Sequence, residues 1–171
     1  MPHPAPDSER AMLLSYLNAQ RDHVRGILEG LDEEALRRAV LPSGWNCLGL
    51  VRHLALDVER FWFGGIVAGE QSVIREAAEG PDDAWQVGSD VPVESVFNLY
   101  RQETDHADAV IAATALDAAP AWWPTELFGD KGVRDLREVM LHVITETACH
   151  AGHLDAVREL IDGRSWLVLT E

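Results

Sequence analysis

The fold and the candidate chemistry of this chain both follow from residues 141–155, which read LHVITETACHAGHLD. In this stretch His142, Glu146 and His150 follow one another at intervals of four residues, and His153 comes three residues later. An α-helix turns by about 100° per residue, so it would bring these four side chains into one narrow sector. Apolar residues fall in the same sector on both sides of the quartet, at Val139, Val143, Val157, Leu160 and Ile161. The pattern predicts a long helix whose core-facing stripe is interrupted by four polar side chains.

A polar quartet inside a protein core is costly unless its charge and its hydrogen bonds are compensated. A buried, unpaired carboxylate is expensive, and each unsatisfied imidazole adds to the cost. A divalent cation compensates well, because neutral imidazole and carboxylate are its natural ligands. The cores of helix bundles are a known setting for such sites. The quartet therefore indicates a metal site, with a hydrogen-bonded polar network that holds no metal as the alternative.

A third protein ligand is expected to come from another helix. His53 lies at the edge of the apolar stripe of a second helical segment, and Asp57, one turn further on, is a candidate ligand or a support for one. Three protein ligands and an open position are typical of a catalytic site, whereas four protein ligands are typical of a structural one. Cys149, next to His150, is interpreted as a small core residue rather than a ligand, although a thiolate would suit zinc.

The fold class follows from helical periodicity, since no segment shows sustained strand alternation. Two connections are long, at residues 69–91 and 116–132, and loops of that length are often functional or allow a crossover between helices. We therefore predict an all-α protein, a four-helix bundle with long connections between helices two and three and between helices three and four. It is expected to form a single domain over residues 1–171. The four predicted helices span about residues 8–31, 46–67, 93–115 and 133–161.

Composition excludes several classes of partner. The 171 residues include 29 acidic and 14 basic side chains, which gives a formal net charge of −15. Nucleic-acid binding needs a basic surface, and a polybasic membrane anchor needs the same. No stretch approaches the roughly 20 apolar residues of a membrane span, and no secretory signal is visible at the N-terminus. Two cysteines, Cys47 and Cys149, do not make a disulfide framework. The expectation is a soluble cytoplasmic protein without a nucleic-acid or membrane partner.

Three segments of the chain resemble the DinB-like four-helix-bundle superfamily, in particular its actinobacterial, mycothiol-dependent branch of S-transferases and maleylpyruvate isomerase N-terminal domains. They are residues 45–54 (WNCLGLVRHL), 146–153 (ETACHAGH) and 155–163 (DAVRELIDG). The resemblance implies that His53, Glu146 and His150 bind a divalent metal. Many members have His where this chain has Glu146, and the Glu form resembles the mycothiol-using branch. The isomerase has a further C-terminal domain and this chain ends at Glu171, so a thiol S-transferase is the expected activity.

The resemblance also implies a mechanism. A divalent metal would activate a low-molecular-weight, mycothiol-like thiol for attack on an electrophile. Zinc is the first choice of metal, and nickel, iron and manganese also suit the ligands. His153 and His142 are candidates for moving a proton or orienting a ligand, and Asp57 for proton transfer or support. The alternatives are a metal-dependent hydrolase and a non-catalytic, metal-stabilised bundle, and a homodimer is possible. Five aromatic residues are candidates for the wall of an apolar pocket: Trp45, Phe61, Trp62, Trp122 and Trp123. For Phe61 and Trp62, a place in the core is the preferred interpretation.

Overall fold

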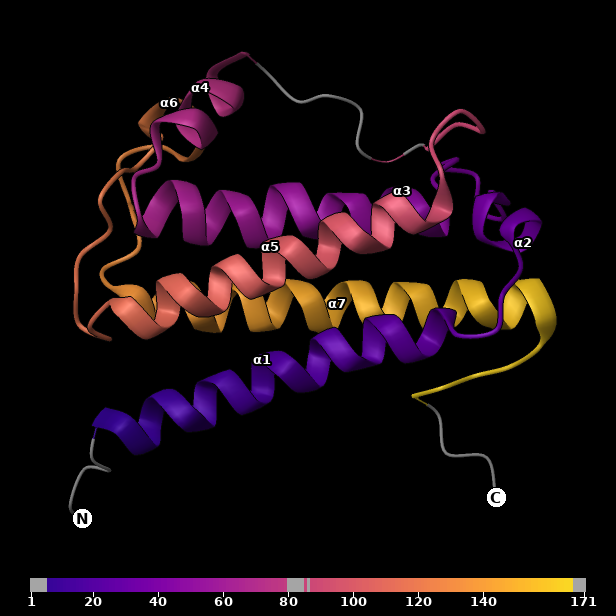
Figure 1. Cartoon of the computed structure of the whole chain (residues 1–171), viewed down its shortest axis with the longest axis horizontal. Coiled ribbons are helices and arrows are strands. Elements are labelled where there is room, and N and C mark those ends of the chain that lie inside the picture. Colours follow the sequence, from indigo (N-terminus) through magenta and orange to yellow (C-terminus); the bar gives the residue numbers. More distant parts are fainter. Residues whose placement is uncertain (1–5, 80–84, 86, 168–171) are drawn as a thin grey trace.

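The regular elements of the protein are all helices in the part of the chain that the computed structural model describes, residues 6–79, 85 and 87–167 (Figure 1). The all-α prediction is therefore confirmed. None of the helices in these residues is long and apolar enough to cross a bilayer. In chain order the elements are α1 (Pro6–Leu28), α2 (Glu33–Arg37), α3 (Cys47–His53), η1 (Leu54–Val67), α4 (Gln71–Glu79), α5 (Val93–Ala113), α6 (Thr125–Phe128) and α7 (Leu136–Asp162).

Four long rods make up the bundle: α1, α3 running directly into η1, α5 and α7 (Figure 1). Helix α7 packs against both α1 and η1, and α5 packs against α3 and η1. Each predicted helix corresponds to one rod, with ends that differ by a few residues. The rod ends follow local chemistry. The Asn46 side chain accepts from the Gly49 N–H at 2.7 Å to begin α3, and that of Asp135 accepts from the Glu138 N–H at 3.0 Å to begin α7.

The second rod differs from the α-helix that the sequence predicts, because from Leu54 onward it is wound as a π-helix. An α-helix repeats every 3.6 residues, and a π-helix is wider because its hydrogen bonds join residues five apart. Most buried residues of η1 recur in pairs every four residues, and Gly64 and Gly65 between the last two pairs are buried as well. These pairs are Leu54 and Ala55, Val58 and Glu59, Trp62 and Phe63, and Ile66 and Val67.

Two short helices lie inside the connections that the sequence predicts as loops. Helix α4 packs on η1, where a Cβ added at Gly65 would lie 3.2 Å from Val73, so that the glycine permits the close approach. Helix α6 is only four residues long and ends at Gly129, which has a φ of 72° that favours glycine. Both helices lie near the end of the bundle where η1 stops (Figure 1).

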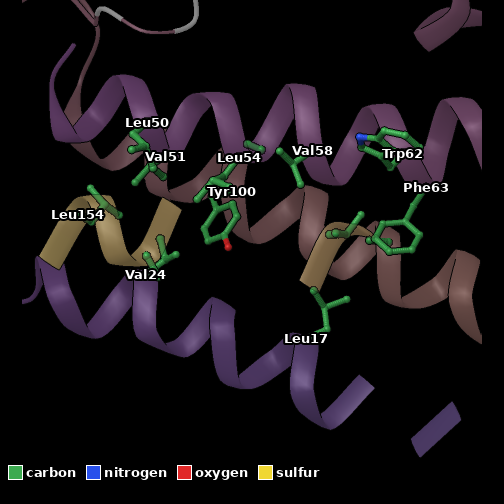
Figure 2. Packing of buried hydrophobic residues seen from close by; sticks show 14 of the residues in the cluster. Leu17, Val24, Leu50, Val51, Leu54, Val58, Trp62, Phe63, Tyr100 and Leu154 are labelled. Atoms are coloured by element: carbon green, nitrogen blue, oxygen red, sulfur yellow. The ribbon is translucent and has the colours of Figure 1, made fainter. Parts of the chain in front are cut away.

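The core runs between the four rods and includes one buried ion pair. Figure 2 shows Leu17 and Val24 of α1 on one side of it and the row Leu50, Leu54 and Val58 of α3 and η1 on the other. On α1 between those two residues, Arg21 donates through Nε and Nη2 to Glu59 of η1 at 2.7 and 2.6 Å. Its Nη1 donates to Asp108 of α5 at 2.7 Å. One guanidinium therefore ties together three of the four rods.

The tail after Gly163, residues 164–169 (RSWLVL), is apolar enough for the sequence to predict that it packs on the bundle. It does so as far as Leu167. The Asp155 carboxylate accepts from the backbone N–H groups of Trp166 and Leu167 at 2.6 and 3.0 Å. The Trp166 ring covers Gly26 of α1 so closely that an added Cβ would lie 2.4 Å from it. The same prediction for residues 168–169 lies outside the described residues. The tail therefore bridges the C-terminal ends of α1 and α7.

Candidate functional site

The structure brings His53 and His150 together from two different rods. His53 is the last residue of α3, and His150 lies in the second half of α7. Their ring centroids are 5.0 Å apart and the ring planes are at 73°. The side chains are 16% and 12% exposed, so each imidazole is largely shielded but reachable from solvent. The predicted convergence of helices two and four on these two histidines is therefore present in the fold.

Asp57 orients the His53 ring from one turn further along the same rod. Its Oδ2 lies 2.8 Å from His53 Nδ1. A carboxylate at this position favours the tautomer with the proton on Nδ1, which leaves the lone pair on Nε2. This is the arrangement in which a metal-binding histidine is commonly supported. Of the three roles predicted for Asp57, which are metal ligand, support of a ligand and proton transfer, this contact favours support of a ligand.

Glu146 and His153 flank His150 on α7. Glu146 Oε2 lies 3.6 Å from His150 Nε2, and His153 Nδ1 lies 3.5 Å from His150 Nδ1. Burial, with smaller contributions from His53 and His153, lowers the pKa of His150 to about 4. The ring is therefore neutral at pH 7, which is the form of imidazole that binds metal ions. We call His53, Asp57, Glu146 and His150 the seam, because they lie where α3 and η1 meet α7.

The polar quartet of α7 is more exposed than the sequence predicts, so the expectation that its four side chains are buried is wrong in this respect. The Glu146 side chain is 40% exposed, and His153 is also exposed. Cys149 is exposed rather than a core residue, and Leu160 is 60% exposed rather than part of the core-facing stripe. The quartet occupies the edge of the buried face of α7, beside residues that point into the bundle, including Val139, Val143 and Leu154.

The chemistry of the seam fits a divalent cation, although its donor atoms do not converge on one point. Among the described residues, no group of three or more His, Cys, Asp or Glu side chains is arranged to hold a metal ion. The expected ligands are instead linked in pairs, His53 with His150 and His150 with Glu146. Two imidazoles and one carboxylate are ligand types that zinc and related metals accept. The metal set predicted for His53, Glu146 and His150 therefore stays a prediction.

Trp85 is a residue of the site that sequence reasoning missed. Its indole stacks on His53, with centroids 4.1 Å apart and planes at 23°, and lies 5.8 Å from the ring of His150. The Asn46 N–H donates to the Trp85 carbonyl at 3.4 Å. Arg37 donates to three carbonyls just beyond it, at Val87, Gly88 and Val91. The only sequence signal was a lone aromatic residue in a long polar connection, so this wall of the site depends on the tertiary fold.

His142 lies apart from His150, against a group of aromatic rings. Its ring centroid is 4.0 Å from that of Trp62, and burial lowers its pKa. We call these rings the aromatic cluster: Phe61, Trp62, Trp122, Trp123, Phe128 and His142. Trp62 is 8% exposed and belongs to the core, whereas Phe61 is half-buried. Of the predicted pocket-wall residues, only Trp45 has no ring contact with this cluster among the described contacts.

The three other histidines, His3, His23 and His106, belong to no such pattern in the sequence, which predicts that they are solvated. His106 Nε2 lies 2.6 Å from Glu70 Oε1, and His23 lies near Gln20, so neither histidine takes part in the candidate site. His3 lies outside the described residues. Cys47 and Cys149 are both free, as expected for a chain without a disulfide framework.

The fold and the seam together define a class: an all-α bundle with imidazoles and carboxylates where two of its rods meet. A family model of mycothiol S-transferases matches residues 12–163, and the chain belongs to this family. No curated protein and no solved structure matches the chain. The matched range contains every residue of the seam and confirms the resemblance to the mycothiol-dependent DinB-like branch. The family supports a thiol S-transferase role with a small thiol as cosubstrate.

Proposed function

We propose that the protein is a metal-dependent thiol S-transferase whose metal ion is bound by His53, Glu146 and His150. The observation that carries the proposal is the pairing of two imidazoles from different rods, 5.0 Å apart, with a carboxylate 3.6 Å from one of them. Membership of a thiol-transferase family supplies the reaction class. The partial exposure of the seam supports an open, catalytic site rather than a closed, structural one.

Two neutral imidazoles and one carboxylate would leave a net charge of about +1 on a divalent ion. When bound there, such an ion would supply Lewis acidity, which lowers the pKa of a thiol so that the reactive thiolate is present at neutral pH. Zinc suits the donor set best, and nickel, iron and manganese accept the same ligand types. The low-molecular-weight thiol would be of the mycothiol type, in keeping with the family.

The chain's own residues would orient the ligands, exclude water and move a proton. Asp57, in contact with His53 Nδ1, keeps Nε2 directed away from that carboxylate. Trp85 covers one face of His53 and excludes water from it. His153 is exposed and lies 3.5 Å from His150, so it is placed to accept the thiol proton and pass it to solvent.

The reaction balances without an oxidant or reductant. The thiolate sulfur donates an electron pair to an electrophilic carbon, and an S–C bond forms. The bond from that carbon to its leaving group breaks, and the leaving group departs with the bonding pair. The thiol proton goes to His153 and then to water. For a chloroarene the products are a thioether, chloride and a proton.

A conjugation assay tests the proposal. Zinc- or nickel-loaded protein is given 1-chloro-2,4-dinitrobenzene or a bimane electrophile with mycothiol, bacillithiol, cysteine or glutathione. We expect metal-dependent conjugation with at least one thiol, lost in His150→Ala and kept in His23→Ala, a matched histidine substitution on α1 away from the seam. Absence of conjugation with every thiol contradicts the transferase. Ester hydrolysis in its place would favour the hydrolase instead.

A further inference from the structure

The aromatic cluster joins the second half of η1, which holds Phe61 and Trp62, to Phe128 of α6. Helix α6 lies near the end of the bundle where η1 stops (Figure 1). Trp62 is at the centre of the cluster. Its ring centroid is 4.0 Å from His142, 5.8 Å from Phe128 and 6.2 Å from Trp123. The Trp123 and Phe128 centroids are 5.5 Å apart, and Phe61 lies 6.0 Å from Phe128. These separations are within the range in which aromatic rings attract one another.

Backbone contacts hold the rings of the cluster in place. The Trp122 N–H donates to the Ile66 carbonyl at 3.2 Å, which joins the connection before α6 to η1. Trp123 Nε1 donates to the Gly129 carbonyl at 2.8 Å. A Cβ added at Gly132 would lie 3.2 Å from the Trp123 ring, so the glycine lets the chain pass close to the indole. Rings that are fixed in advance bind a flat ligand with little further loss of conformational freedom.

One side of the cluster is open to solvent, unlike the core. Phe128 is 49% exposed, although its ring stacks on that of Trp62 with the planes at 16°. Its neighbour Leu127 is 59% exposed, and Leu141, which precedes His142, is 49% exposed. Large apolar side chains that gather at a surface commonly mark a binding site.

The cluster continues directly into the seam. His142 contacts Trp62 and lies one helical turn before Glu146, which is about 6 Å along α7. His150 lies a further turn along α7, about 12 Å from His142, so a molecule with its reactive carbon near Glu146 would lay an attached ring against His142 and Trp62, on which Phe128 stacks. The exposed side chains of the cluster and beside it, Phe128 and Leu127, are apolar, so a neutral ring fits there best.

We propose that the aromatic cluster binds the neutral aromatic ring of the electrophilic substrate, with Phe128 as the exposed stacking surface. This assignment rests on the proposed transferase function, because it names the class of molecule that the thiolate attacks. A planar arene with its leaving group on or next to the ring suits both the stacking surface and the separation of about one helical turn between His142 and Glu146.

Binding of an unreactive probe tests the assignment without metal, thiol or activity. Equilibrium dialysis measures binding of 1,3-dinitrobenzene to the metal-free, full-length protein. We expect Phe128→Ala to weaken binding about tenfold, and Phe128→Leu, which keeps an apolar side chain, to weaken it less. Leu160→Ala, at another exposed apolar residue near the far end of α7, and His150→Ala should leave binding unchanged. If the wild-type protein binds the probe normally but conjugates no thiol, the failure lies in the proposed function and not in ring binding by the cluster.

Two results would overturn the assignment. One is that Phe128→Ala binds the probe as tightly as the wild type does, or that Leu160→Ala loses as much probe affinity as Phe128→Ala. The other is sedimentation showing a wild-type dimer that Phe128→Ala converts to a monomer, because the cluster would then be a contact between two copies of the chain. If the protein conjugates, Phe128→Ala should raise the KM for 1-chloro-2,4-dinitrobenzene, which has a ring, and leave the KM for iodoacetamide, which has none, unchanged. An equal rise in the two KM values would contradict a ring-binding role.

Discussion

The ion pair between Arg21 and Glu59 is buried inside the bundle, and removal of Arg21 alone is expected to destabilise the protein strongly. The two side chains are 2% and 1% exposed, so water cannot replace the lost partner. Arg21→Met would leave the Glu59 carboxylate without the two hydrogen bonds of 2.7 and 2.6 Å that now compensate its burial. Breaking a pair of this kind typically costs about 3–5 kcal/mol of unfolding free energy.

The loss should depend on pH in a definite direction. Burial raises the pKa of Glu59, and Arg21 partly offsets that rise. Without the guanidinium, the pKa of Glu59 should rise further. A carboxyl group whose folded-state pKa is raised takes up a proton on folding, so its contribution is fully present below the unfolded pKa of about 4.3 and is lost as pH rises through the folded value. Arg21→Met should therefore lose more stability at pH 8 than at pH 5.5.

Urea unfolding followed by circular dichroism at both pH values measures the effect. The matched control is Arg25→Met, because Arg25 pairs with Asp22 on the surface, where the side chains are 46% and 67% exposed, and such pairs contribute little. The double substitution Arg21→Met with Glu59→Leu should recover most of the lost stability, since both charges are removed. A loss in Arg21→Met of under about 1 kcal/mol at both pH values, or one equal to that of Arg25→Met, would refute the reasoning.

Three further predictions concern the site and the tail. Asp57→Ala should weaken zinc binding about 10–100-fold by releasing the ring of His53, and an unchanged affinity in a chelator competition would remove its supporting role. Trp85→Phe should abolish most of the tryptophan fluorescence quenching caused by bound Ni²⁺, because Trp85 stacks on His53, and persistence of that quenching would place the ion elsewhere. Gly26→Ala should destabilise the protein by about 1–3 kcal/mol in urea unfolding, because the new methyl group would meet the Trp166 ring at 2.4 Å. Trp166→Ala should relieve most of that loss, and equal losses with and without the tryptophan would contradict the close contact.

The long helices could be predicted because their signals are local. Apolar periodicity and the side-chain caps at Asn46 and Asp135 lie within a few residues of the helix starts that they determine. The π-helical winding after His53 could not be predicted in this way. It depends on how the rod packs on its neighbours, and a recurrence of buried residues every four positions resembles an α-helical stripe.

The candidate site could be predicted in part. The spacing of His142, Glu146 and His150 gives their common side of α7, but it cannot show how far the neighbouring rod covers that side. For this reason the half-exposed state of Glu146 and the exposure of Cys149 differ from expectation. Trp85 reaches the site through a long connection, and no local pattern indicates where such a connection lies.

An anomalous-scattering experiment tests the central claim most directly. Crystals of the full-length protein grown with zinc are measured above and below the zinc absorption edge. We predict one anomalous peak per chain, bound by the imidazoles of His53 and His150 and the carboxylate of Glu146. A peak on other residues, or no peak at the seam at saturating zinc, would contradict a metal centre where α3 and η1 meet α7.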